Sequence, residues 1–390
     1  MNKFLLSLSA LSLGLLCSCT SSTPSDEEGI LTIRIPEFPS SADKWDTIRY
    51  SDLYSEINFL PLEVHPEVGM KDITFLLALP NQEFVGLDNY DKQIARFNAA
   101  GQFLNLIGCK GHARNEYIAP VDIHYDTYAD EVLVADRAGA LLSYKPDGTF
   151  VNKVKLPWND FHIAQVAPDT LVAINVHGLE MEGHRFVLFT KQGEVLSQYE
   201  PYSLEDWSEW IKSHEQFDLL GHSSMHRLES NDVMTYRDGQ LQQAVRFVVP
   251  PYTSYMRDKL KVHAKRVDEN KKSNAPYIVP EASEEFTCTG FSVFGSRCFF
   301  LMSDKANSFF GIYDLNTRQC KIYGKVVDDM TGLEPFLISD CRRDGCVYQT
   351  MPSFELDLSA SHSDLDSVQT AYYKDMAASC SFVIIVGKMK

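Results

Sequence analysis

Several patterns that mark common enzyme and membrane-protein classes are missing from this 390-residue sequence. It has no G-x-S-x-G elbow, no H-E-x-x-H motif, no Walker loop and no dinucleotide-binding glycine pattern. Beyond the N-terminal segment, no apolar run is long enough to cross a bilayer. Cationic residues are also few: 36 Lys and Arg stand against 53 Asp and Glu, a net charge of −17. This balance argues against nucleic acid as a partner, because neutralising phosphates requires cationic surface.

The N-terminal segment predicts export and lipidation. Lys3 precedes an apolar run over residues 4–16, which is too short for a permanent membrane helix and fits a secretory signal. The following LCSC resembles a bacterial lipobox and predicts a lipoprotein signal peptide over residues 1–18, with acylation of Cys19. The alternative is a simple secretory signal that ends near Ser18. Acylation anchors firmly, since each buried methylene contributes about 0.8 kcal/mol.

The segment that follows this cysteine predicts a flexible tether over residues 19–29. Its residues are small, polar and acidic, and they cannot bury enough apolar surface to become ordered. Position 20 is Thr instead of Asp, which by analogy with other lipoproteins favours the outer membrane. We therefore expect an outer-membrane lipoprotein, periplasmic or surface-exposed, that touches the membrane through its lipid only.

Seven cysteines lie beyond Cys19, and an odd number leaves at least one thiol free or intermolecular. Most stand in apolar stretches, where cysteine is often a small buried residue. Cys341 and Cys346 differ, because RRDG between them is typical of a hairpin turn. Such a turn could bring the two thiols across a strand pair, so this pair is a candidate disulfide.

A repeat with a period near 46 residues runs through the chain. Four β-prone hairpins, among them ARFNAAGQFLNLIG and LSYKPDGTFVNKVKL, carry a turn glycine at Gly101, Gly148, Gly193 and Gly239. About four short strands per period is the signature of a β-propeller. We predict an all-β fold, a six-bladed β-propeller over residues 30–390, with blades near 70–108, 118–157, 160–200, 217–249, 285–326 and 333–390.

Ring closure and insertions complete this prediction. The last blade is expected to take a strand from the N-terminal segment, and residues 30–35 and 56–64 are both candidates. Two charged segments without strand alternation, near 204–217 and 252–272, predict inserted helices. Inserts of this kind usually decorate one face of a ring, where binding surfaces form.

The sequence resembles a known family at several motifs. INFLPLEV, FNAAGQFLNLIG, a G-x-x-x-x-EY loop and the final strand FVIIVGKMK are similar to the six-bladed β-propeller lipoproteins of Bacteroidetes, and the unit around 93–148 resembles an NHL-type repeat. The resemblance implies a propeller at the cell envelope and carries no chemistry. Relatives often have G-x-GPGEY in the loop, whereas this chain has GHARNEY.

Candidate site residues fall into three groups. The loop residues His112, Arg114 and Glu116 stand where relatives keep glycines, and they are candidates for ligand contact. Asp88 and Asp136 occupy equivalent repeat positions, where a turn-forming role is expected and a ligand role arises if either lines the channel. Trp207 and Trp210 could contact a glycan or a protein, or could dock the inserted helix.

The same residues indicate neither a metal site nor a cofactor. Cys109 and His112 have C-x-x-H spacing, but a metal requires three or four ligands, and a connector between blades explains the pair. Acidic candidates for acid/base chemistry are Asp88, Asp122, Asp136, Glu116 and Asp238. Since no catalytic pattern stands out, we expect a lipid-anchored, non-catalytic module that binds an envelope protein or a glycan. The alternative is a propeller lyase or hydrolase acting on glycans or lactones, with a carboxylate or metal centre in the channel.

Overall fold

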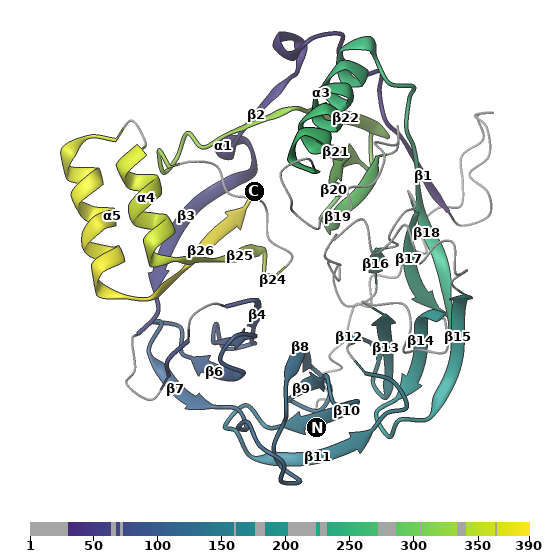
Figure 1. The fold of residues 1–390 in the computed structure, drawn as a ribbon, viewed down its shortest axis with the longest axis vertical. Helices are drawn as coiled ribbons and strands as arrows, with labels where there is room; N and C mark the ends of the chain where they lie inside the picture. Colours follow the sequence, from purple (N-terminus) through teal and green to yellow (C-terminus); the bar gives the residue numbers. More distant parts are fainter. Residues whose placement is uncertain are drawn as a thin grey trace, which may run out of the picture.

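The structure is a computed structural model, and it describes a ring of blades around a central axis (Figure 1). The described residues are 30–63, 68–70, 73–159, 161–175, 184–201, 224–226, 232–271, 286–304, 306–333, 341–362 and 365–390. Among them, six four-stranded sheets form the blades, and one two-stranded sheet lies outside them. The predicted six-bladed β-propeller is therefore confirmed.

Four blades, the first, second, third and fifth, are continuous antiparallel meanders in which strand order follows the chain. Blade 1 holds β4 (Phe75–Ala78), β5 (Phe84–Asp88), β6 (Gln93–Phe97) and β7 (Phe103–Leu106); blade 2 holds β8 (Pro120–Asp126), β9 (Glu131–Asp136), β10 (Ala140–Tyr144) and β11 (Phe150–Lys155); blade 3 holds β12 (Phe161–Ala167), β13 (Thr170–Asn175), β14 (His184–Thr190) and β15 (Val195–Pro201). The repeat glycines form the turns before the outer strands. Gly101, Gly148 and Gly193 have φ of +78°, +87° and +86°, a backbone region that glycine adopts without steric cost.

Blade 4 shows a feature that the repeat does not predict. Its strands β16 (Ser224–His226), β17 (Asp232–Arg237) and β18 (Gln240–Val248) are extended on the outside by β1 (Leu31–Arg34), which pairs with β18 in parallel. Gly239, at φ +80°, lies in the hairpin between β17 and β18. Of the two N-terminal candidates for closing the ring, residues 30–35 thus serve another blade.

Blades 5 and 6 complete the circle. Blade 5 holds β19 (Thr287–Phe294), β20 (Arg297–Ser303), β21 (Ser308–Asp314) and β22 (Gln319–Tyr323); blade 6 holds β24 (Cys341–Arg343), β25 (Cys346–Pro352), β26 (Phe382–Met389) and β3 (Tyr54–Pro61). The last three strands of blade 6 are antiparallel, so β3 seals the ring against the C-terminal strand β26. This confirms the prediction that the N-terminal segment supplies the closing strand.

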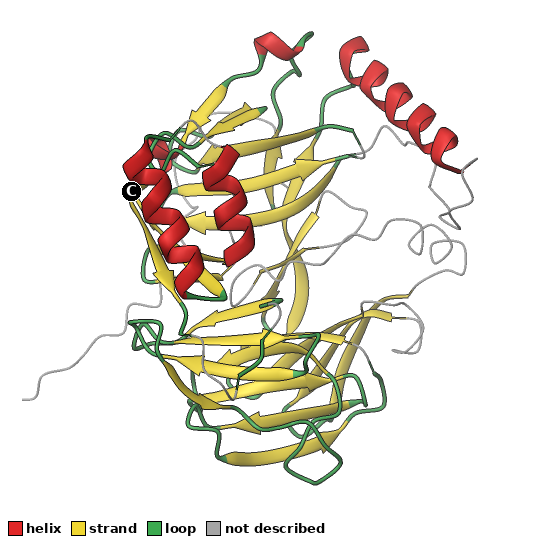
Figure 2. Ribbon diagram, turned by 60° about the vertical axis from the view of Figure 1, so that its left-hand side comes forward, coloured by secondary structure: helices red, strands yellow, loops and turns green. Residues whose placement is uncertain are grey.

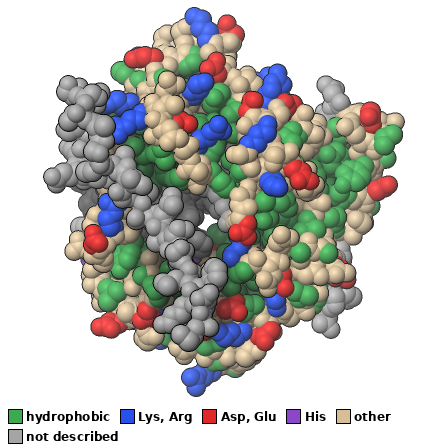
Figure 3. Space-filling view, turned by 180° about the vertical axis from the view of Figure 1, so that it is seen from behind, with side chains coloured by type: hydrophobic (Ala, Val, Ile, Leu, Met, Phe, Trp, Pro, Cys, Tyr) green, Lys and Arg blue, Asp and Glu red, His purple; other side chains and the backbone are tan. Residues whose placement is uncertain are grey.

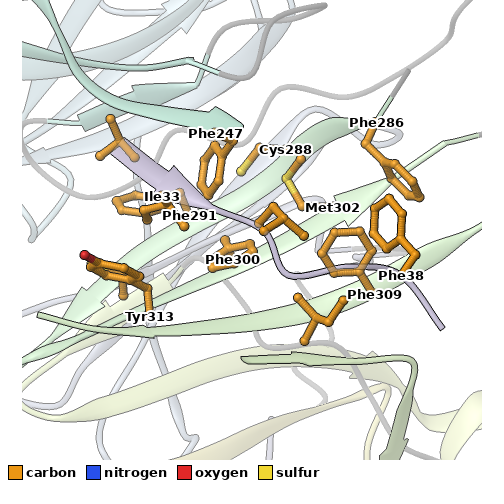
Figure 4. Packing of buried hydrophobic residues seen from close by; sticks show 14 of the residues in the cluster. Ile33, Phe38, Phe247, Phe286, Cys288, Phe291, Phe300, Met302, Phe309 and Tyr313 are labelled. Carbon is orange, nitrogen blue, oxygen red and sulfur yellow. The ribbon is translucent and has the colours of Figure 1, made fainter. Parts of the chain in front are cut away.

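Between β1 of blade 4 and β3 of blade 6, the N-terminal segment crosses blade 5. It contains the short helix η1 (Ala42–Lys44), β2 (Thr47–Arg49) and α1 (Tyr50–Leu53), and β2 pairs with β23 (Lys325–Val327) in parallel. Figure 4 shows Ile33 and Phe38 of this segment packed among aromatic side chains of blades 4 and 5. Phe38 lies 5.5 Å and Trp45 6.0 Å from the ring of Phe309. The segment is therefore part of the core of these blades.

The longer helices of the described residues lie at two places on the ring (Figure 2). The charged segment near 252–272 forms α3 (Ser254–Lys271), as predicted, and it buries Met256 and Leu260 while Val262 is exposed. The second predicted insert, 204–217, lies outside the described residues. The sequence did not predict α4 (Ser353–His362) and α5 (Ser367–Ser379), which stand between β25 and β26.

Candidate functional site

The repeated aspartates at the ends of β5 and β9 are structural. Asp88 and Asp136 are fully buried. Asp88 accepts hydrogen bonds from the N–H groups of the two turn residues Tyr90 and Asp91, at 2.6 and 3.0 Å. Asp136 accepts from three N–H groups of the chain around it, those of residues 118, 119 and 138, at 2.9, 2.8 and 3.3 Å. These hydrogen bonds agree with the expected role of both aspartates in turns and connectors.

The GHARNEY loop is held in place by hydrogen bonds to its own glutamate. The Glu116 carboxylate accepts from the Ala113 N–H at 2.8 Å and from the Cys109 thiol at 3.7 Å. Burial of the sulfur and the adjacent carboxylate raise the pKa of Cys109. His112 and Arg114 are exposed beside this closed loop. Of the three loop candidates, Glu116 thus supports the loop, and the other two remain available at the surface.

Three candidate residues lie outside the described part of the chain, and the candidate disulfide lies within it. Cys19, Trp207 and Trp210 lie outside the described residues. The expected hairpin after Cys341 is present, with its turn at Asp344 and Gly345, but the register pairs Cys341 with Tyr348 and Arg343 with Cys346. The two cysteines are therefore not opposite each other, and Cys346 is a free thiol. The predicted disulfide is not formed in this structure.

Polar side chains on the innermost strands join blades 2 and 3 at the ring centre. Asp122 of β8 is buried, and its carboxylate accepts the N–H of Ile163 of β12 at 2.8 Å and that of Ile123 at 2.8 Å. The Nδ1 of His162 lies 3.4 Å from the same carboxylate. Two residues along β8, His124 Nε2 accepts the Gln165 N–H at 3.4 Å. Asp122 therefore holds strand edges together, and its oxygens are engaged.

No metal centre accompanies this group. Within the part of the chain that the structure describes, no three His, Cys, Asp or Glu side chains come together as metal ligands.

Across the described residues, no helix is long and apolar enough to cross a membrane.

A hollow of about 480 Å³ lies between blades 1 and 2. It is lined by Leu79, Pro80, Asn81, Glu83, Arg96, Tyr125, Asp130, Lys145, Pro146 and Asp147. These residues come from the turn between β4 and β5, from β6, from the end of β8 and the turn that follows it, and from the turn that follows β10. Its size falls within the roughly 300–1,000 Å³ typical of small-molecule sites.

The charged groups on the wall of the hollow are held by partners of their own. Arg96 donates from Nε to Glu83 at 2.8 Å and from Nη1 to the Pro146 carbonyl at 3.2 Å, which ties blade 1 to blade 2. The Tyr125 hydroxyl donates to Asp130 at 2.6 Å. Burial, followed by this hydrogen bond, raises the pKa of Tyr125, so the phenol keeps its proton. The wall is thus an array of fixed polar groups with nearly balanced charge.

Sequence reasoning missed these lining residues, because they belong to separate strands and turns of two repeats. One signal was present: Arg96 stands inside the apolar strand segment QIARF, where a charged side chain requires a partner. Figure 3, the view from behind, shows an opening near the ring centre, with charged side chains of both signs on its right-hand side. The charged residues are therefore distributed over this face in both signs.

The geometry defines the class as a six-bladed β-propeller with a polar hollow between its first two blades. The chain belongs to the family described as "Domain of unknown function (DUF4934)", whose model matches residues 33–374. A search of curated proteins finds no significant match.

Solved structures include similar propellers. A protein of Bacteroides fragilis that is named as exported has 15% identity and a TM-score of 0.64, covering 93% of this chain and 99% of its own. This likeness supports the fold. A DUF4221 family member from Bacteroides vulgatus has 10% identity and a TM-score of 0.44, covering 87% and 97%. Virginiamycin B lyase from Staphylococcus aureus has 11% identity and a TM-score of 0.42, covering 75% and 80%.

Proposed function

We propose that the protein is a lipid-anchored propeller of the outer membrane that binds a small, neutral, hydroxyl-rich ligand without transforming it. The lipobox-like LCSC, with Cys19 as the predicted acylation site, supports the anchor. A propeller of similar fold from Bacteroides fragilis is named as exported, which agrees with an address in the envelope. The hollow between blades 1 and 2 supplies the binding site.

The observation that carries the proposal is the wall of this hollow, in which three carboxylates and two cations each have a partner of their own: Glu83, Asp130, Asp147, Arg96 and Lys145. Arg96 and Glu83 neutralise each other, and Asp130 accepts from Tyr125. Such paired groups still offer lone pairs and N–H groups to hydroxyls, but they give a charged ligand little net attraction. Leu79, Pro80 and Pro146 add apolar surface of the kind on which a ring can rest. This combination fits a sugar-like molecule.

The alternative is an enzyme with a carboxylate in the channel. Asp122 is the acidic residue that this idea would use, and its two oxygens already accept backbone N–H groups of two strands. A general base must be able to reach the proton that it removes. A binding role for the protein therefore has more support than catalysis at this residue.

The binding site is tested by titrating the mature protein against a panel of neutral oligosaccharides. We expect Asn81→Ala and Asp130→Asn each to weaken binding about tenfold, or roughly 1.4 kcal/mol, because the first removes a hydrogen-bonding side chain and the second replaces a charged acceptor with a weaker neutral one. Asp238→Asn is the matched control, since Asp130 and Asp238 share a φ of +53° and Asp238 lies in blade 4. Unchanged affinity in both hollow variants, or turnover of a sugar by the wild type, would refute this assignment.

The anchor has a separate test. Cells expressing the wild type are labelled with a radioactive fatty acid, and the protein is followed through membrane fractionation. We expect Cys19→Ser to abolish the label and release the protein from the membrane. A Cys17→Ser variant serves as the control and keeps both. Labelling that survives the change at Cys19 would contradict the anchor without touching the hollow.

A further inference from the structure

The helix pair α4–α5 replaces a tight turn. Pro352 at the end of β25 pairs with Phe382 at the start of β26, and the Ser353 N–H donates to the Ser381 carbonyl at 2.9 Å. A short hairpin turn would therefore complete the blade. The chain instead inserts residues 353–381, which the ring itself does not require.

The inner side of this pair is fixed to the ring. Leu356 and Ala360 of α4, and Tyr373 and Met376 of α5, are buried in one cluster with strand β26. Tyr373 stacks edge-on against Phe59 of the closing strand, with ring centroids 5.2 Å apart. Asp366 caps α5 by accepting two backbone N–H groups at 2.8 Å. The pair is thus a rigid element with one face already occupied.

The outer side of the pair carries large apolar side chains in water. Phe354 is 67% exposed and Leu358 55%, and they stand four residues apart on α4. Val368 is 76% exposed and Tyr372 55%, with the same spacing on α5. Residues four apart lie on one face of a helix. In Figure 3, hydrophobic side chains gather at the right-hand edge, where these helices lie.

The charged residues around these apolar side chains indicate which kind of molecule could cover them. The described residues of this insert include four acidic residues and a single Lys or Arg: Glu355, Asp357, Asp366, Asp375 and Lys374. In a pair of identical copies, these like charges would face each other. In a bilayer, the carboxylates between the apolar residues would lose their water at high cost. A protein surface with apolar anchors and basic side chains at its rim satisfies both features.

We propose that α4–α5 is a docking surface for a protein partner that presents an apolar helix flanked by Lys or Arg. The apolar side chains supply the contact area, and the acidic residues attract the partner and fix its orientation. This surface is separate from the hollow between blades 1 and 2, so the two assignments succeed or fail independently.

The test uses two designed amphipathic helical peptides with the same Leu face. One carries Lys on its flanks and the other carries Glu, and both are titrated by fluorescence anisotropy against the whole mature protein. We expect the Lys peptide to bind and the Glu peptide to bind at least tenfold more weakly. The affinity of the Lys peptide should fall as salt is raised, because screening weakens the charge contribution.

Variants decide whether the peptide sits on the proposed surface. Phe354→Ser with Leu358→Ser should weaken the Lys peptide at least tenfold. Leu104→Ser with Val151→Ser, two residues of outer strands that are each 42% exposed, should leave it unchanged. Equal binding of both peptides, or no loss in the helix variant, would overturn the proposal. So would a dimer in light scattering, or co-sedimentation of the unacylated protein with phosphatidylcholine vesicles, if the helix variant abolished it.

Discussion

Substitution of Gly101 probes the seam where the ring closes. Gly101 has φ +78°, and a Cβ built on it would lie 2.2 Å from the carbonyl oxygen of Pro61, the last residue of the closing strand β3. The Gly101 carbonyl accepts the Glu63 N–H at 2.8 Å, and the Phe103 N–H donates to the Glu63 carboxylate at 2.9 Å. The turn of blade 1 therefore holds the end of the strand that seals blade 6.

Gly101→Ala has two separable costs. An L-residue in the left-handed region costs about 1–2 kcal/mol, and forcing a methyl group against a packed backbone oxygen costs about 1–3 kcal/mol more. The matched control is Gly239→Ala, where φ is +80° and no atom lies within 4 Å of the added Cβ. The control should lose only the conformational part. The difference between the unfolding free energies of the two variants, about 1–3 kcal/mol, measures the steric cost of the methyl group against the Pro61 carbonyl oxygen.

Urea unfolding of the mature protein, followed by circular dichroism, gives this difference. We expect the midpoint of Gly101→Ala to lie clearly below that of Gly239→Ala, with similar slopes, because both variants unfold the same surface. Equal midpoints would refute the reasoning, since they would mean that the turn of blade 1 does not press on the closing strand.

Three other predictions concern buried or shielded polar groups. Asp136→Ala should lower the free energy of unfolding in urea by about 2–4 kcal/mol, because the backbone N–H groups that now donate to the carboxylate would lose their acceptor. For Asp126, burial alone raises the carboxyl pKa, but Lys191 and nearby hydrogen bonds hold the pKa below its usual value. The resulting stabilisation of the fold is present above pH about 4 and is lost as pH falls through the lowered pKa. Asp126→Asn should therefore lose less stability than the wild type when the pH is lowered. Cys109 should react with iodoacetamide at pH 8 more slowly than free cysteine, and Glu116→Gln should accelerate it; unchanged rates would contradict the raised pKa.

The architecture was largely predictable because it repeats. Each repeat glycine stands where the backbone turns with positive φ, so the period of the sequence gives the period of the blades. The closing strand was also predictable, since the β-prone residues 56–64 precede the first blade. What failed was the role of residues 30–35: a parallel addition to blade 4 depends on which outer edge is left open, and no local pattern specifies that edge.

The helix pair was missed for a related reason. Its sequence alternates apolar and polar residues only loosely, because Leu356 and Ala360 face the ring while Phe354 and Leu358 face solvent. A helix with apolar residues on two sides gives no clear period of 3.6. The hollow was missed because its walls come from two repeats, and contacts such as Arg96 with Pro146 join residues 50 positions apart.

The N-terminal segment connects the proposed anchor to the proposed binding site. Its residues 30–61 run along the outside of three consecutive blades, as β1 on blade 4, as an aromatic strip on blade 5, and as β3 on blade 6. The tether from Cys19 therefore joins the ring at the edge of blade 4, and its eleven residues reach at most about 38 Å. Blade 4 lies across the ring from blade 1 (Figure 1). The proposed anchor would thus attach to the ring on the side away from blade 1, and a tether of this length would leave the hollow between blades 1 and 2 open to a ligand.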